Sequence, residues 1–429
     1  MSLAFNEEQR ALKDSVRNFA KDQSPIEAFR ALRSQTDGAG FDNTVWQAMI
    51  ELGLSGALFP EAYGGFEFGS TGLAGCMEEL GRNLVASPLL ASVLSGSAIL
   101  HAGSEEQKQT LLPQIISGEK LVALACDEGH HHQPKNIAAS AVREGHTFIL
   151  NGSKTRVING VSADLFVVAA RTSGNAGDTQ GISLFLVDAN TSGLQRDAAT
   201  LVDSQRYARL TLDNVCIPDS HLIGEVNNGF SALDKALDYG RIYLAAEMFG
   251  GMQEIFERTV QYLKERKQFG TLIGTFQALQ HRAAHMFTEI EMCKSILMLA
   301  LDALEKNADN APQLISGAKA KLSDTYELIS NEATQMHGGI GVTDELDIGL
   351  FLKRARVSAG TLGSARFHYD RYAPRWKVFE AVRSPLRYSR PANCCYRSIS
   401  RVALFIRLSV SAMANVARSP RAALHHLSH

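Results

Sequence analysis

The spacing of apolar residues changes twice along the chain and divides it into three blocks. In the first block, residues 1–118, Phe5, Leu12, Val16 and Phe19 recur at helical spacing, and the same period continues through later Leu, Ala and Met positions. The pattern predicts an N-terminal helical domain.

The second block, residues 119–224, has the shorter period that is typical of strands. Several short runs are rich in β-branched and aromatic residues and are bounded by Gly, Asn, Ser and Asp. These predicted strands are 147–152, 165–170, 182–187 and 208–212. The first of them ends in Asn151-Gly152, so we expect that strand to run into a turn. The block therefore predicts a small β domain.

The third block, residues 225–373, returns to long helices. Residues 229–269 and 276–306 are each long enough for an extended helix of a bundle. Helices, then a small β domain, then a helical bundle predict an α+β fold with three domains.

Composition argues against several classes of function. The formal net charge is -2, which does not suggest a nucleic acid or a membrane surface as partner. No apolar run reaches the roughly 18 residues that a transmembrane helix needs. Residues 1–19 mix acids and bases like an amphipathic helix, not a signal peptide, and the six cysteines lack zinc or redox spacing. We therefore expect a cytoplasmic protein with reduced thiols.

Positive charge is concentrated at the C-terminal end. Residues 374–429 hold ten Lys or Arg and one acid, Glu380, so this tail carries about +9 and the rest of the chain about -11. We expect a basic, disordered extension. The alternative is a basic arm that binds nucleic acid.

The first motif is Arg266-Lys267-Gln268-Phe269-Gly270, where a long helix should end, with Gly270 as its stop. Phe276-Gln277 follows seven residues after Phe269. An arginine guanidinium at this position can bind a pyrophosphate through two parallel charge-assisted hydrogen bonds. The simpler interpretation is a solvated basic helix end.

The second motif is Gln335-Met336-His337-Gly338-Gly339, which follows another helical run. Glycines let a backbone approach a ligand closely and expose its amide donors, and Gln335 adds a side-chain amide. Alone, such a turn is more often only a helix stop.

Together, in this order, the two motifs resemble the paired FAD-binding segments of the acyl-CoA dehydrogenase family. The resemblance covers about residues 4–373 and includes the Pro-Glu-Ala-Tyr-Gly-Gly turn at 60–65 and the Asn-Val-Cys-Ile-Pro segment at 214–218. It implies an N-terminal helical domain, a central β-barrel-like domain and a C-terminal four-helix bundle, usually assembled as a tetramer.

The resemblance also implies the chemistry. The family removes hydrogen across the α,β bond of an acyl-CoA thioester: a carboxylate takes the α-proton, hydride passes to FAD, and an electron-transferring flavoprotein accepts the electrons. The resemblance implies that eight residues of this chain contact the FAD bound in a neighbouring subunit. They are Arg266, Gln268, Phe269, Phe276, Gln277, Gln335, Gly338 and Gly339.

The sequence departs from the family where the catalytic base belongs. The usual base is a glutamate in a turn that here reads Thr361-Leu362-Gly363, so Leu362 takes its position. Other members place the glutamate before a helical arginine, and here Gly240 precedes Arg241. Neither residue accepts a proton, so we expect no catalytic base at either position.

The flavin-facing segments of the β domain differ as well. The family's Thr-Glu-Pro stretch is replaced by residues 127–133, which contain three consecutive histidines. The family's flavin-shielding tryptophan is replaced by Arg156, the nearby threonine by Ile158, and the segment after the base turn reads Ser-Ala-Arg at 364–366. Consecutive histidines point in different directions, so we expect a polar loop there and no metal site.

These differences suggest a hypothesis: the chain keeps what it would give to a neighbour's FAD and lacks what it would use itself. It would then be the non-catalytic, FAD-completing partner of a homologous catalytic subunit. It resembles the small subunits of two-gene dehydrogenases for steroid side-chain or pimeloyl-type CoA esters.

Two alternatives remain open at this point. One is a self-sufficient dehydrogenase, assembled with copies of itself, whose base is relocated to Asp238, Glu247, Glu345 or Asp347. The other is a flavin-dependent monooxygenase of the same fold, which needs no such carboxylate.

Overall fold

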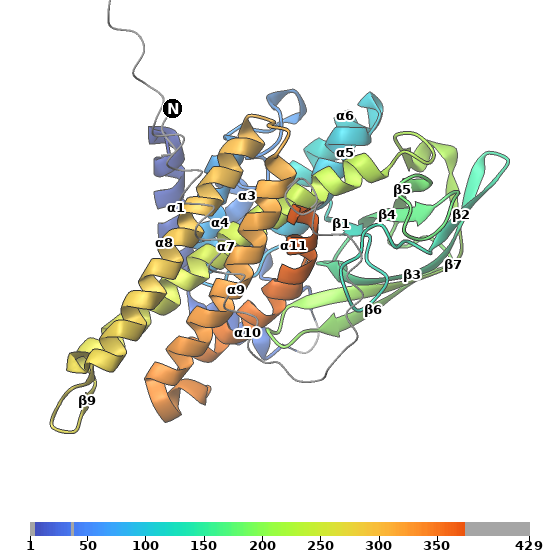
Figure 1. Cartoon of the computed structure of the whole chain (residues 1–429). Coiled ribbons are helices and arrows are strands. Elements are labelled where there is room, and N and C mark those ends of the chain that lie inside the picture. The colour runs from blue at the N-terminus through green and yellow to red at the C-terminus, as the bar shows by residue number, and fades with distance from the viewer. Residues whose placement is uncertain (1–4, 36–37, 374–429) are drawn as a thin grey trace, which may run out of the picture. The chain divides into compact units, whose positions relative to one another are not determined.

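Six helices form the N-terminal part of the chain in the computed structural model, which describes residues 5–35 and 38–373 (Figure 1). Their bounds are α1 Glu7–Gln23, α2 Ile26–Arg33, α3 Asn43–Glu51, α4 Gly69–Arg82, α5 Leu89–Ala102 and α6 Glu105–Ile116. Reciprocal bonds fix two of the starts, because Asn6 with Gln9 and Ser104 with Gln107 each form a capping box. Helix α5 is buried from Leu89 to Ile99, so it forms the centre of this domain.

The central part is one eight-stranded sheet, and it confirms the small β domain. Seven strands follow the order β6-β7-β3-β2-β4-β5-β8, and β1 pairs with β4. Their bounds are β1 Val122–Ala125, β2 Ser140–Glu144, β3 Thr147–Ile158, β4 Leu165–Arg171, β5 Ile182–Asp188, β6 Leu194–Thr200, β7 Arg206–Pro218 and β8 Leu222–Ile223. Alternate side chains such as Phe148, Phe166 and Phe185 share a core of their own.

The expected turn at Asn151-Gly152 is wrong, because β3 continues through it. The register against β7 shifts between Leu150 and Gly152, and Gly152 has φ 143. A Cβ there would lie 2.6 Å from that of Ala139. The glycine therefore marks a bulge at a close approach of two backbones.

Five helices form the C-terminal part and confirm the predicted bundle. They are α7 Phe230–Glu265, α8 Gln277–Glu305, α9 Ala311–His337, α10 Ile348–Gly360 and α11 Ala365–Tyr372. Helix α9 packs against α7, α8, α10 and α11. The predicted tail, 374–429, lies outside the described residues.

The expected helix stop at Gly270 is also wrong. Helix α7 ends at Glu265, and the next residues form a hairpin of β9 Lys267–Gln268 and β10 Thr271–Leu272. Phe269 and Gly270 both have positive φ, 54 and 79, which is the backbone of a two-residue type I′ turn. The hairpin projects beyond the ends of α7 and α8 (Figure 1).

A buried arginine joins the sheet to the bundle. The Arg354 guanidinium on α10 donates to Asp203 at 2.9 Å, in the β6–β7 turn, and to Glu247 on α7 at 2.7 Å. Burying these charges is tolerable because each has a partner of opposite sign. Within the described ranges, no helix is both long and apolar enough to cross a membrane.

Candidate functional site

Gly240 and Leu362, the two positions aligned with a family base, lie close together in the structure. Gly240 lies in α7, and Leu362 lies in the turn between α10 and α11. A Cβ on Gly240 would come within 2.9 Å of Leu362 Cδ1 and 2.4 Å of Leu94 Cδ2. Both base positions therefore face the same small volume, and leucine side chains fill it.

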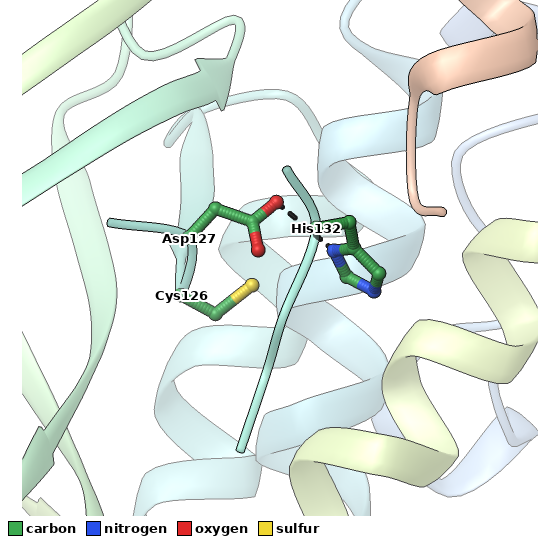
Figure 2. A group of neighbouring side chains, drawn as sticks. All are labelled: Cys126, Asp127 and His132. Atoms are coloured by element: carbon green, nitrogen blue, oxygen red, sulfur yellow. Dashed lines mark hydrogen bonds and ion pairs between the residues drawn. The ribbon is translucent and has the colours of Figure 1, made fainter. Parts of the chain in front are cut away.

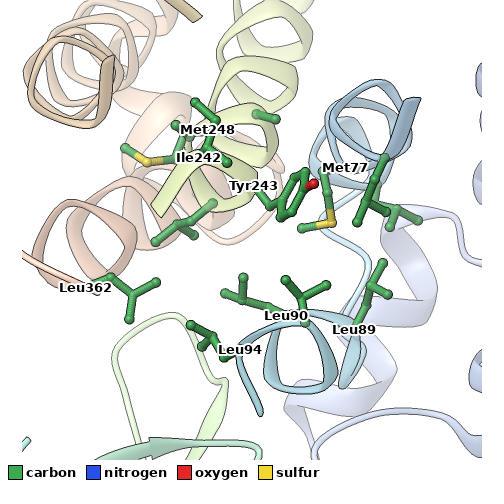
Figure 3. Close-up of a cluster of buried hydrophobic side chains, with 14 of the residues drawn as sticks. Met77, Leu89, Leu90, Leu94, Ile242, Tyr243, Met248 and Leu362 are labelled. Carbon is green, nitrogen blue, oxygen red and sulfur yellow. The ribbon is translucent and has the colours of Figure 1, made fainter. Parts of the chain in front are cut away.

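Apolar side chains line this volume on several sides (Figure 3). Helices α4, α5 and α7 and the Leu362 turn supply them, and all are buried. They include Met77, Leu89, Leu90, Leu94, Ile242, Tyr243, Met248 and Leu362. Neither Gly240 nor Leu362 carries a side-chain group that can take a proton.

Three buried basic side chains donate hydrogen bonds to backbone carbonyls of the Leu362 turn. The Leu362 carbonyl accepts from His368 Nε2 at 3.1 Å and from Arg241 Nε at 3.4 Å. Lys319 Nζ donates to the Ser358 and Gly363 carbonyls. Burial lowers the pKa of Lys319 to about 7. These bonds keep Leu362 at φ 55, a backbone conformation that costs a non-glycine residue of the order of 1–3 kcal/mol.

A polar chain crosses from the sheet domain to the bundle beside this turn. His132 Nδ1 lies 2.9 Å from Asp127 Oδ2, and His132 Nε2 lies 3.1 Å from Arg241 Nη2 (Figure 2 shows the first contact). Arg241 also donates to Asp238 at 2.8 Å and Asp234 at 3.1 Å. An arginine N–H only donates, so His132 Nε2 accepts, and the ring proton sits on Nδ1.

Residues 130–132 lie in a loop, as expected, but the sequence did not predict that His132 is buried. His130 and His131 are exposed, whereas His132 is 4% exposed and makes the contacts above. Its partner Arg241 is 109 positions away in sequence, and nothing in the local pattern signals that contact.

The sulfur of Cys126 adds a third potential metal ligand to Asp127 and His132, since the three ligand atoms lie within 4.8 Å of one another (Figure 2). The surroundings disfavour a cation, because Arg241 and Arg156 both act on this group. Burial also raises the pKa of the Cys126 thiol, so the thiolate that binds metals is disfavoured. The cluster is better described as an ion-paired loop.

Further ion pairs fix the segments that were expected to face a flavin. Lys154 is fully buried and lies 2.5 Å from Glu128, which also accepts the backbone N–H of Ala138 and Ala139. Arg156 has φ 51 and lies 3.5 Å from Asp127. These contacts hold residues 127–139 against β3.

All eight predicted cofactor residues lie away from the buried Leu362 volume. They are exposed at one end of the bundle, at the end of α7, in the hairpin, at the start of α8, in the last turn of α9 and in the turn after it: Arg266, Gln268, Phe269, Phe276, Gln277, Gln335, Gly338 and Gly339. Tyr262 stacks on His337 at 4.4 Å between ring centres, which holds the two segments side by side. Phe269 is 92% exposed, so the hairpin tip is an apolar surface without cover in this chain.

The four alternative base residues have other surroundings. Glu247 is paired with Arg354, and Asp238 with Arg241 and Arg371. Asp347 binds Arg30 and Arg258, and Glu345 is exposed.

Comparison with known proteins matches nearly the whole described chain. Family models of the acyl-CoA dehydrogenase N-terminal, middle and C-terminal domains match residues 6–119, 124–215 and 227–375. The caffeyl-CoA reductase-Etf complex subunit CarC of Acetobacterium woodii is 31% identical over 360 residues, which are 82% of this chain and 94% of that protein.

Solved structures agree with this match. Butyryl-CoA dehydrogenase from Megasphaera elsdenii superposes with a TM-score of 0.80 at 25% identity, over 87% of this chain and 98% of that one. A variant of the Tcur3481-Tcur3483 steroid ACAD superposes with a TM-score of 0.77 at 30% identity, over 85% and 96%.

We predict that Gly240→Ala destabilises the protein by about 1–3 kcal/mol, because its methyl group meets Leu94 and Leu362 in a filled volume. In the double variant with Leu94→Ala, that methyl group enters the space that the leucine leaves. The double variant should therefore lose about 1 kcal/mol less stability than the two single variants together. Chemical unfolding of the three variants measures this coupling. Gly360→Ala is the matched control, since a Cβ there has nothing within 4 Å. Additive losses would show that Gly240 and Leu94 do not share one volume.

Proposed function

The chain belongs to the acyl-CoA dehydrogenase family, whose members are FAD-binding flavoproteins, and we propose that it is the non-catalytic, FAD-completing subunit of a heteromeric acyl-CoA dehydrogenase. The observation that carries the proposal is the contrast between its two halves of the site. The interior base positions are filled with apolar side chains, while the segments proposed to contact FAD are exposed at one end of the bundle.

The interior supports the proposal through what it lacks. A thioester α-proton is weakly acidic, so its removal requires a positioned base within hydrogen-bond reach. Gly240 and Leu362 offer none, and Leu94 closes the volume between them. The carboxylates weighed as replacements are paired with arginines or exposed.

The exposed end of the bundle fits a dinucleotide from outside the chain. The Arg266 guanidinium has no hydrogen-bond or ion-pair partner among the described residues. It follows Tyr262 by one helical turn, and Tyr262 stacks on His337, which directly precedes Gly338 and Gly339. A pyrophosphate would be held there by charge-assisted bonds from Arg266 and by backbone amides of the turn. FAD supplies the hydride acceptor when bound, and here this chain's residues would only hold and orient it.

The chain's own cleft does not fit the flavin ring. An aromatic ring needs about 3.5 Å to the atoms on each face, hence a gap of about 7 Å. The His132 and Phe367 rings, from the two segments expected to face the ring, lie 5.0 Å apart between centres.

The relatives support both kinds of partner. The name of the Tcur3481-Tcur3483 steroid ACAD joins two components, which fits a heteromeric dehydrogenase. CarC is named as a subunit of a complex with Etf. By analogy, the proposed partners are a homologous catalytic subunit and an electron-transferring flavoprotein. The proposed substrate is the CoA ester of a steroid side chain or a dicarboxylic acid.

We expect the protein expressed alone to be colourless and unable to oxidise acyl-CoA esters, because its own cleft offers neither a ring site nor a base. Co-expressed with a homologue that has the glutamate in its base turn, it should yield a yellow complex that reduces an artificial electron acceptor. Absorbance at the flavin bands and steady-state assays measure both properties. A lone chain with one FAD per subunit and acyl-CoA oxidation would refute the proposal, and oxygen consumption alone would favour a monooxygenase.

In that complex, Arg266→Ala should weaken FAD binding about 10- to 100-fold, because it removes a bond to a charged phosphate. Fluorescence of FAD released on dilution measures the affinity. Arg209→Ala is the control, since Arg209 is also an exposed arginine but lies on β7 in the sheet domain. Equal FAD retention in both variants would mean that Arg266 does not contact the cofactor.

A further inference from the structure

Three side chains from two domains meet at the edge of the cleft. Asp127 and His132 belong to the loop after β1, and Arg241 belongs to α7 of the bundle. The contacts of 2.9 Å and 3.1 Å form one continuous path from the sheet domain to the buried core of the bundle. On the bundle side the path continues through Asp238 to Arg371 on α11.

An aromatic contact closes the same place. Phe367 on α11 packs edge-on against His132 at 5.0 Å, and the Arg241 guanidinium lies over the Phe367 ring at 5.5 Å. The loop after β1 and the residues after the Leu362 turn thus touch directly. They are the two segments between which a cofactor ring would have to enter.

We propose that Asp127, His132 and Arg241 form a clasp that closes this chain's own cleft in place of a cofactor and that opens when His132 takes a second proton. That the clasp takes the place of a flavin rests on the proposed function. That the three side chains form a clasp rests on the contacts above. A neutral ring donates from Nδ1 to Asp127 and accepts at Nε2 from Arg241. A doubly protonated ring has an N–H at Nε2, which would point at the Arg241 donor, so that link breaks.

The surroundings determine when this happens. The groups that face His132 are Asp127 in its own loop, Arg156 on β3, Arg241 on α7 and His368 on α11. Burial lowers the pKa of His132 most strongly, the two arginines lower it further, and only Asp127 raises it. The pKa of His132 in the folded chain lies below its value in the unfolded chain, about 6.5, so the clasp is fully intact above pH 6.5. It is lost as the pH falls through the folded pKa.

Hydrogen–deuterium exchange of the lone full-length chain tests the clasp. It is followed from pH 7.5 down to the lowest pH at which α5 keeps its protection, and is corrected for the intrinsic rates. Amides of residues 127–136 should exchange about 10- to 100-fold faster at the lower pH, as expected for loss of a bond to a charged group. Residues 89–102 of α5 should keep their protection, because they lie within the N-terminal core.

Two variants separate the clasp from general acid unfolding. His132→Gln keeps a neutral donor and acceptor and should stay protected over this pH range. His132→Ala removes both bonds and should exchange fast throughout it. Wild-type protection over the whole pH range in which α5 stays intact would overturn the protonation step. An Ala variant as protected as the wild type at pH 7.5 would overturn the clasp. Neither result bears on acyl-CoA oxidation by the lone chain, which tests the proposed function separately.

Discussion

The buried guanidinium of Arg241 is the contact on which the rest of the cleft depends. It is fully buried, and a cation without partners would be very costly there. It binds Asp238 on its own helix, the Leu362 carbonyl of the base turn and His132 of the sheet domain. One side chain therefore fixes the bundle, the turn and the loop relative to one another.

Around this contact the site is divided by solvent exposure. Leu94, Leu362 and Gly240 form a filled apolar interior in which neither a ring nor a proton acceptor has a place. Arg266 and the glycine turn after α9 are exposed at one end of the bundle, and the described residues do not cover them.

Periodicity predicted the three blocks and their classes because burial of one face repeats along the sequence. It did not predict how ends and turns form. Asn151-Gly152 continues β3 because β7 runs alongside it, with a bulge at Asp213 and Asn214 of β7 opposite Asn151. Phe269-Gly270 became a hairpin turn where a helix stop was expected. The family pattern was enough to predict an apolar residue, Leu362, at the position expected for a base. The burial of His132 was not, because its partner Arg241 is distant in sequence.

The most direct test of the central claim is a count of FAD molecules in the assembled protein. Native mass spectrometry of this chain with its catalytic homologue gives the cofactor number for an oligomer of known composition. The account predicts one FAD for each pair of unlike chains, seated in the homologue and completed by the Arg266 segment. Two FAD molecules per pair would place a flavin in the cleft beside His132 and contradict it.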